Sequence, residues 1–140
     1  MVLASIDIGS NTLRLLIANI ERGEIASLEA RMAITRLGEG VGRNRILKKD
    51  NMEKSVSVLK EFSSLISKYN VSRVKAVGTS ALREAENSGE FIQRAFSETG
   101  IRVEVISGNE EAALTAKGVL SGMDKIGSSL IIDIGGGSTE

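Results

Sequence analysis

The sequence contains no cysteine and no histidine among its 140 residues. Without cysteine there can be no disulfide bond, thiolate zinc site or cysteine nucleophile. Without histidine there can be no Ser-His-Asp triad, and most transition-metal sites are excluded as well. A catalytic acid or base in this chain must therefore be a carboxylate, a lysine, a tyrosine or a bound water. A bound metal must accept oxygen ligands, as Mg²⁺ does.

The sequence also lacks an excess of positive or negative charge, and it has no long apolar segment. The chain carries 18 basic and 18 acidic side chains, so its charge gives no general attraction for nucleic acid or an anionic membrane. The first apolar run meets Asp7 too early to form the core of a signal peptide. No run approaches the ~20 apolar residues of a membrane-spanning helix. We therefore expect a cytoplasmic globular protein with neither nucleic acid nor membrane as a partner.

The hydrophobic pattern predicts strands that alternate with helices. Strands are expected over residues 3–8, 13–20, 24–35, 73–77, 102–106 and 129–134. Tight turns join the first three, which makes them antiparallel. Three antiparallel strands followed by α-β-α-β-α, with helices packed on one mixed sheet, is the order of a ribonuclease H-like half-domain.

Helices are expected from about residue 50 to 69, from about residue 80, and over 87–98 and 109–120. The first carries an apolar stripe at helical spacing, formed by Met52, Val56, Leu59, Phe62, Ile66 and Tyr69. Asp50 is its expected N-cap. The glycine-rich segment 37–45 is interpreted as a mobile connection without a phosphate-binding role.

One local pattern occurs twice. Residues 4–10 read ASIDIGS and residues 130–136 read LIIDIGG, so each apolar segment leads to an Asp-Ile-Gly sequence at Asp7 and Asp133. Glycine allows backbone N–H groups to come close to a phosphate, and an aspartate at a strand end can orient Mg²⁺. The residues alone leave two interpretations open, a phosphate clamp or a pair of ordinary strand-turn units.

Four segments carry a more specific resemblance: DIGSNT at 7–12, GTSALR at 78–83, ISGNEEA at 106–112 and DIGGGSTE at 133–140. In order and spacing they resemble the signature segments of the exopolyphosphatase/guanosine pentaphosphatase family of the actin-like ATPase superfamily. The resemblance implies an actin-like, ribonuclease H-like α/β fold. Residues 1–126 would form the first actin-like domain, and residues 127–140 would supply the opening strand and phosphate loop of a truncated second domain.

The resemblance also implies an activity. Members of this family are phosphohydrolases that release terminal phosphate from inorganic polyphosphate, guanosine pentaphosphate or both, and the sequence does not separate these substrates. A homodimer is the expected assembly, and this chain alone is expected to be weak or inactive. Two alternatives stay open: another actin-like small-molecule kinase or ATPase, and a non-catalytic phosphate-binding or assembly fragment.

The family's functional residues match individual positions of this chain. The general base would be Glu111, and Arg83 would hold a substrate phosphate. Asp133 and Glu140 would place Mg²⁺. The first phosphate loop would comprise Asp7, Gly9, Ser10 and Asn11, the second Gly135, Gly136 and Ser138, and Arg14 is a further candidate.

The residues themselves distinguish the two adjacent glutamates. Ser107 and Glu110 have the spacing of a capping box, which gives Glu110 a structural role at a helix N-terminus. Glu111 has no such role, and by itself it would be interpreted as a solvated carboxylate that favours the helix dipole. Likewise, Arg83 next to Glu84 would by itself be interpreted as part of a surface ion pair.

Overall fold

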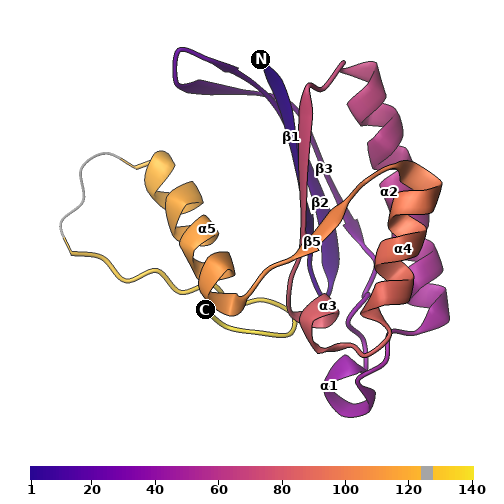
Figure 1. Cartoon of the computed structure of the whole chain (residues 1–140). Helices are drawn as coiled ribbons and strands as arrows, with labels where there is room; N and C mark the ends of the chain where they lie inside the picture. The colour runs from indigo at the N-terminus through magenta and orange to yellow at the C-terminus, as the bar shows by residue number, and fades with distance from the viewer. Residues whose placement is uncertain (124–127) are drawn as a thin grey trace.

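A computed structural model describes residues 1–123 and 128–140 of the chain. Its centre is a mixed five-stranded sheet in the order β3-β2-β1-β4-β5 (Figure 1). The strands are β1 (Val2–Ile8), β2 (Thr12–Glu21), β3 (Glu24–Ile34), β4 (Arg73–Gly78) and β5 (Val103–Val105). The first three form an antiparallel meander, while β4 lies parallel to β1 and β5 parallel to β4. This confirms the strand order expected for a ribonuclease H-like half.

The helices follow the expected alternation. They are α1 (Val41–Asn44), α2 (Lys49–Lys68), α3 (Ser80–Glu84), α4 (Ser88–Thr99) and α5 (Gly108–Ser121). Helices α2 and α4 lie side by side over one face of the sheet, and α5 stands apart on the other side (Figure 1). No helix in the described ranges is both long and apolar enough to cross a bilayer.

The covered face of the sheet holds the core. Alternate side chains of β1 and β2, such as Ile6, Ile8 and Leu15, are at most 2% exposed and face the apolar stripe of α2. Four members of that stripe, Met52, Val56, Leu59 and Phe62, are buried, and Ile66 and Tyr69 pack partly buried beside them. Burying one such side chain is worth about 1.5–3 kcal/mol. The ends of β1 and β4 are thereby held on a rigid support.

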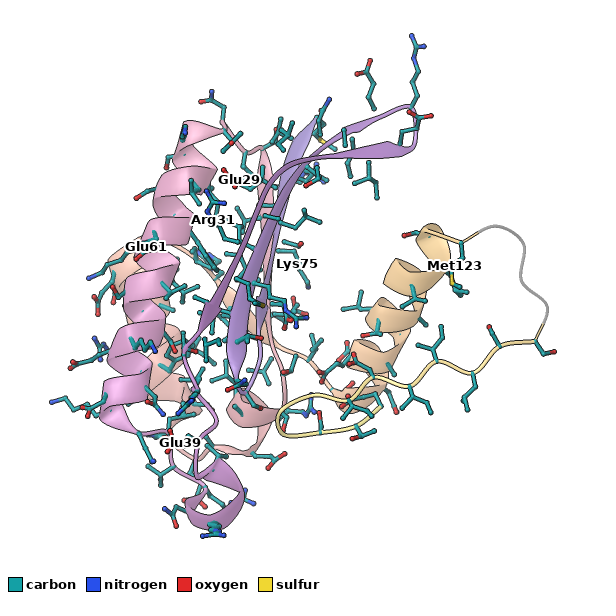
Figure 2. All side chains as sticks on the ribbon, turned by 180° about the vertical axis from the view of Figure 1, so that it is seen from behind. Glu29, Arg31, Glu39, Glu61, Lys75 and Met123 are labelled. Atoms are coloured by element: carbon teal, nitrogen blue, oxygen red, sulfur yellow. The ribbon has the colours of Figure 1, made fainter. Side chains whose placement is uncertain are left out.

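Each face of the sheet carries an ion pair, and Figure 2 shows on which side each pair lies. Glu29 and Arg31 of β3 lie toward α2, where they form an ion pair of 2.7 Å, and Tyr69 donates a hydrogen bond to Glu29. Lys75 of β4 lies on the opposite side, where its ammonium group pairs with Glu104. The face toward α5 is thus partly polar, and α5 itself contains no buried residue.

The expected N-cap of α2 was wrong. The helix begins at Lys49, its N-cap position is Lys48, and no side chain caps it there. Asp50 lies one position inside the first turn, where a carboxylate still interacts favourably with the helix dipole. Its stabilising role is therefore electrostatic.

The segment 37–45 is also more ordered than a mobile connection. Leu37 is fully buried, Val41 is 3% exposed, and residues Val41–Asn44 form the single turn α1. Gly40 precedes this turn with φ of +86°, a conformation that glycine adopts without a steric penalty. Two apolar anchors therefore fix this glycine-rich segment against the core.

The expected strand over residues 129–134 is wrong as well. The segment is extended but lies outside the sheet, and its only pairing among the described residues is an isolated bridge between Ile134 and Thr139. A strand needs a neighbour to satisfy its backbone groups. Leu130, Ile132 and Ile134 remain 85%, 62% and 79% exposed. The tail instead runs back alongside α5 toward the ends of β1 and β4 (Figure 1).

Candidate functional site

A cleft of about 390 Å³ opens where β1 and β4 end and the tail returns. It is lined by residues 7, 9–12, 14, 79, 80, 111 and 133–138. The two Asp-Ile-Gly segments, which lie at opposite ends of the sequence, thus form two walls of one cleft. The cleft contains all predicted phosphate-loop residues, Asp133, Glu111 and Arg14.

The first wall is the turn after β1. The Gly9 N–H donates to the carbonyl of Thr12 at 3.0 Å and closes this turn. The carbonyls of Ser10 and Asn11 accept hydrogen bonds from the segment that follows β3. Within the described parts of the chain, the N–H groups of Ser10 and Asn11 have no hydrogen-bond partner. Successive unpaired N–H groups at a turn are suited to an anion.

The second wall is the glycine turn of the tail. Asp133 and Glu140 exchange two backbone hydrogen bonds of 2.9 and 3.0 Å across it, and the Gly135 N–H donates to the Ser138 carbonyl at 2.9 Å. A Cβ atom on Gly137 would lie only 2.7 Å from the hydroxyl oxygen of Ser10 and equally close to that of Ser80. A side chain at position 137 would require both hydroxyls to rotate away or the tail to move, so glycine allows the two walls to approach this closely.

Glu111 reaches the cleft from the first turn of α5 and is held by Arg83. The Arg83 Nη1 donates to the Glu111 Oε2 at 2.8 Å and to the Ile106 carbonyl at 3.0 Å. The Arg83 Nη2 lies 3.7 Å from the Glu140 Oε1. Arg83 therefore contacts two carboxylates and a carbonyl, and the surface ion pair with Glu84 is not formed. Glu84 accepts instead a hydrogen bond from the Ser80 hydroxyl at 2.8 Å.

The structural role predicted for Glu110 is confirmed. Its carboxylate accepts a hydrogen bond from the Ser107 N–H at 2.8 Å, and its own N–H donates to the Ser107 hydroxyl at 3.2 Å. The hydrogen bond from the Ser107 backbone lowers the pKa of Glu110. The two adjacent glutamates thus have different environments, one at the helix cap and one at the cleft.

Asp7 and Asp133 are the carboxylates of the two Asp-Ile-Gly segments. Burial raises the pKa of Asp7; the Arg14 guanidinium on the neighbouring strand lowers it, and the charge of Asp133 raises it. Asp133 accepts a hydrogen bond from the Thr115 hydroxyl of α5 at 2.8 Å. Two carboxylates that repel each other across a polar cleft are a suitable environment for a divalent cation with oxygen ligands.

The fit of Glu140 to such a cation differs from that of Asp133. The Glu140 Oε1 faces Arg83, and its Oε2 is buried without a partner among the described residues. In the same part of the chain, no three acidic side chains lie close enough together to hold a metal ion by themselves. The described residues thus offer the carboxylates of Asp7 and Asp133, which line the cleft, and the unpartnered Oε2 of Glu140.

Sequence reasoning did not select Thr79, Ser80 or Gly137 as site residues. All three line the cleft, and Thr79 and Ser80 are 7% and 3% exposed. The signal for the first two was their position directly after β4, where a parallel strand ends at the same edge as β1. Nothing in the sequence distinguished Gly137 from its two glycine neighbours, because its importance comes from contacts with distant residues.

The model of the Ppx/GppA phosphatase family matches residues 16–140. This chain belongs to that family. It is 35% identical to a putative exopolyphosphatase of Haemophilus influenzae and 36% identical to a guanosine-5'-triphosphate,3'-diphosphate pyrophosphatase of Vibrio cholerae. These matches cover 99% and 98% of the chain but 43% and 28% of the two relatives.

A solved structure supports the fold. The crystal structure of the Aquifex aeolicus member of the Ppx/GppA family is 42% identical to the chain and superposes with a TM-score of 0.89. The match covers 99% of this chain and 45% of that one. The chain therefore spans less than half the length of these relatives and has the fold of the corresponding part of the Aquifex aeolicus protein.

Proposed function

We propose that the natural protein containing this chain is a phosphohydrolase that removes the terminal phosphate from inorganic polyphosphate, guanosine pentaphosphate or both. The observation that carries the proposal is the position of Glu111, a carboxylate held by Arg83 at the edge of a cleft formed by two glycine turns. The names of the two curated relatives support both substrates. Residues 1–126 would be the first actin-like domain and residues 127–140 the opening of a second, with a boundary that lies outside the described residues.

In the proposed mechanism Glu111 is the general base. It accepts a proton from a water molecule that attacks the terminal phosphorus. The N–H groups of Ser10 and Asn11 bind phosphate oxygens from one wall, and the turn containing Gly135, Gly136 and Ser138 does so from the other. The leaving group is the shortened polyphosphate or the guanosine tetraphosphate.

Arg83 has a second role in this mechanism beside the phosphate contact expected from the resemblance. Its guanidinium is engaged by Glu111, Ile106 and Glu140, so it orients the base. A planar guanidinium keeps several oxygen atoms at fixed angles, which an ammonium group cannot do. Contact with a substrate phosphate would use the N–H groups that these partners leave free.

Asp7 and Asp133 would hold a divalent cation, with Glu140 as a further oxygen donor. The cation would neutralise the negative charge that the phosphates bring into the cleft. Because the chain has no histidine or cysteine, this site would favour Mg²⁺ or a similar cation over softer metals. The expected homodimer remains a prediction.

The test is phosphate release from long-chain polyphosphate by the natural protein, with Mg²⁺ and no nucleotide. The proposal predicts release that is lost in Glu111→Gln and kept in Glu61→Gln, a matched change of an exposed glutamate on α2 (Figure 2). Release that required a nucleotide would favour a kinase. Binding without release from either polyphosphate or guanosine pentaphosphate would favour a phosphate-binding protein.

A further inference from the structure

The segment after β3 supports the first phosphate loop through its backbone. The N–H groups of Thr35 and Arg36 both donate to the Asn11 carbonyl at 3.0 Å. The Gly38 N–H donates to the Ser10 carbonyl at 2.8 Å. Both carbonyls at the tip of the loop are therefore bound to this segment, which leaves the N–H groups of the same two residues for a ligand.

Gly38 lies in tight contact with two parts of the cleft wall. A Cβ atom at this position would lie 2.8 Å from the Cβ of Ser10, 3.1 Å from its Cα, and 3.0 Å from the Cβ of Ala81. A Cβ or Cα atom cannot rotate away as the end of a long side chain can, so the backbone itself would have to move. The φ angle of Gly38 is not positive. Alanine could therefore adopt the same backbone conformation, and the restriction at this position is steric.

These contacts connect Gly38 to the place where the two walls of the cleft approach each other at Gly137. A Cβ on Gly137 would lie 2.7 Å from the hydroxyl oxygens of Ser10 and Ser80, and Ser80 adjoins Ala81. A shift of Ser10 or Ala81 away from position 38 would therefore move these hydroxyls and change the space between the two walls. The buried side chains of Leu37 and Val41, on either side of Gly38, prevent the segment from moving outward instead.

We propose that Gly38 is a positioning residue, which sets the spacing between the first phosphate loop and the start of α3 and so determines how tightly the cleft holds a phosphate. The inference rests on the proposed function of the cleft as a phosphate site. It gives the glycine-rich segment 37–45 a role in substrate binding, although this segment contains no phosphate-binding motif.

The test compares Gly38→Ala with Gly42→Ala in the natural protein. Gly42 lies four residues away in α1, also lacks a positive φ, and has open space where a Cβ would be. Binding of tripolyphosphate with Mg²⁺ is measured by calorimetry, and kcat/KM is measured with polyphosphate. A displacement of about 1 Å in a positioned group can cost about 100-fold. We therefore expect Gly38→Ala to weaken binding and kcat/KM by about 10- to 100-fold, and Gly42→Ala to change neither.

Repeating the comparison in a protein that carries Ser10→Gly distinguishes a positioning role of Gly38 from a general loss of stability. Ser10→Gly removes the Cβ that Gly38→Ala would contact at 2.8 Å. Contacts of 3.0 Å with the Ala81 Cβ and 3.1 Å with the Cα at position 10 remain in this background. Adding Gly38→Ala to Ser10→Gly should therefore cost less binding than adding it to the unaltered protein, and the double variant should be more stable than Gly38→Ala alone.

Two results would overturn the inference. One is that Gly38→Ala and Gly42→Ala bind tripolyphosphate equally well, whatever their melting temperatures. The other is that the loss of binding is the same with and without Ser10→Gly. If the unaltered protein binds tripolyphosphate but releases no phosphate from any of the substrates, the proposed hydrolysis is wrong. The binding comparison would then still decide the role of Gly38.

Discussion

Arg83 and Glu111 form an ion pair of 2.8 Å that joins the end of α3 to the first turn of α5. Both side chains are mostly buried, with 24% and 16% of their surfaces exposed. The same Arg83 nitrogen also donates to the carbonyl of Ile106, the residue that directly follows β5. The direction in which Glu111 points is therefore determined by α3 and the sheet as well as by its own helix.

Replacing Glu111 should remove most of the turnover without unfolding the protein. Glutamine keeps the shape of the side chain but cannot accept the proton of the attacking water, and general-base catalysis contributes about 10²- to 10⁴-fold. Steady-state phosphate release from polyphosphate measures the loss. Glu110→Gln is the control, since glutamine also satisfies a capping box, and it should keep turnover at a cost of no more than about 1 kcal/mol. Loss of turnover in Glu110→Gln but not in Glu111→Gln would instead make Glu110 the general base.

Arg83→Lys should lower kcat more than it raises KM. A lysine amine can meet one of the Arg83 partners well but cannot present a planar fork to Glu111, Ile106 and Glu140 together. The control is Arg94→Lys, which changes an arginine of similar exposure that pairs with Glu98 on α4. A rise in KM with unchanged kcat would instead place Arg83 directly on the substrate phosphate. Equal kinetics for both variants would show that Arg83 has neither role.

The carboxyl group of Asp7 should contribute less to the stability of the folded protein at neutral pH than in acid. Burial raises its pKa above the ordinary 3.8, an effect that Arg14 opposes and Asp133 increases. A raised folded pKa favours the protonated form in the folded state. Its contribution to stability is therefore fully present below pH 3.8 and is lost as the pH rises through the folded pKa.

We accordingly expect Asp7→Asn to raise the melting temperature at pH 7 in the presence of a chelator. The gain should shrink toward zero as the pH approaches 3.8. Asp50→Asn, at an exposed position in the first turn of α2, should show no such gain because it only weakens a favourable helix-dipole interaction. A gain for Asp7→Asn that does not depend on pH would contradict this electrostatic explanation.

Gly137→Ala should disturb the contact between the two walls of the cleft. Its Cβ would lie 2.7 Å from the hydroxyl oxygens of Ser10 and Ser80, so both hydroxyls would have to rotate away or the tail would have to move outward. Calorimetry with tripolyphosphate should show weaker binding. Gly118→Ala in α5, where a Cβ meets no atom within 4 Å, should leave binding unchanged and add about 1 kcal/mol of helix stability. Unaltered binding in Gly137→Ala would mean that the tail does not form part of the phosphate site.

Local patterns in the sequence predicted the parts of this structure that depend on neighbouring residues. The apolar stripe of α2, the capping box of Ser107 and Glu110, and the antiparallel start of the sheet are of this kind. The incorrect N-cap at Asp50 was a shift of two residues from the actual cap. The expected strand over 129–134 failed because a strand is defined by its neighbour, and no apolar pattern supplies one.

The rest of the site depends on contacts that no local pattern contains. Arg83 is separated from Glu111 by 28 positions, and Gly38 from Ala81 by more than 40. The family resemblance brought Arg83 and Glu111 into consideration together, but it did not indicate that one holds the other. The importance of Gly38 and Gly137 lies in the absence of a side chain at two crowded points, which is apparent only when the chain is folded.

Hydrolysis with Glu111 as the general base can be followed through the oxygen atom of the attacking water. The natural protein is incubated with polyphosphate and Mg²⁺ in water enriched in ¹⁸O, without nucleotide, and the released phosphate is analysed by mass spectrometry. We expect each phosphate released to carry one ¹⁸O atom from water, and Glu111→Gln to lower the rate at which labelled phosphate appears by about 10²- to 10⁴-fold. Labelled phosphate formed equally fast by Glu111→Gln, or no phosphate until a nucleotide is added, would contradict it.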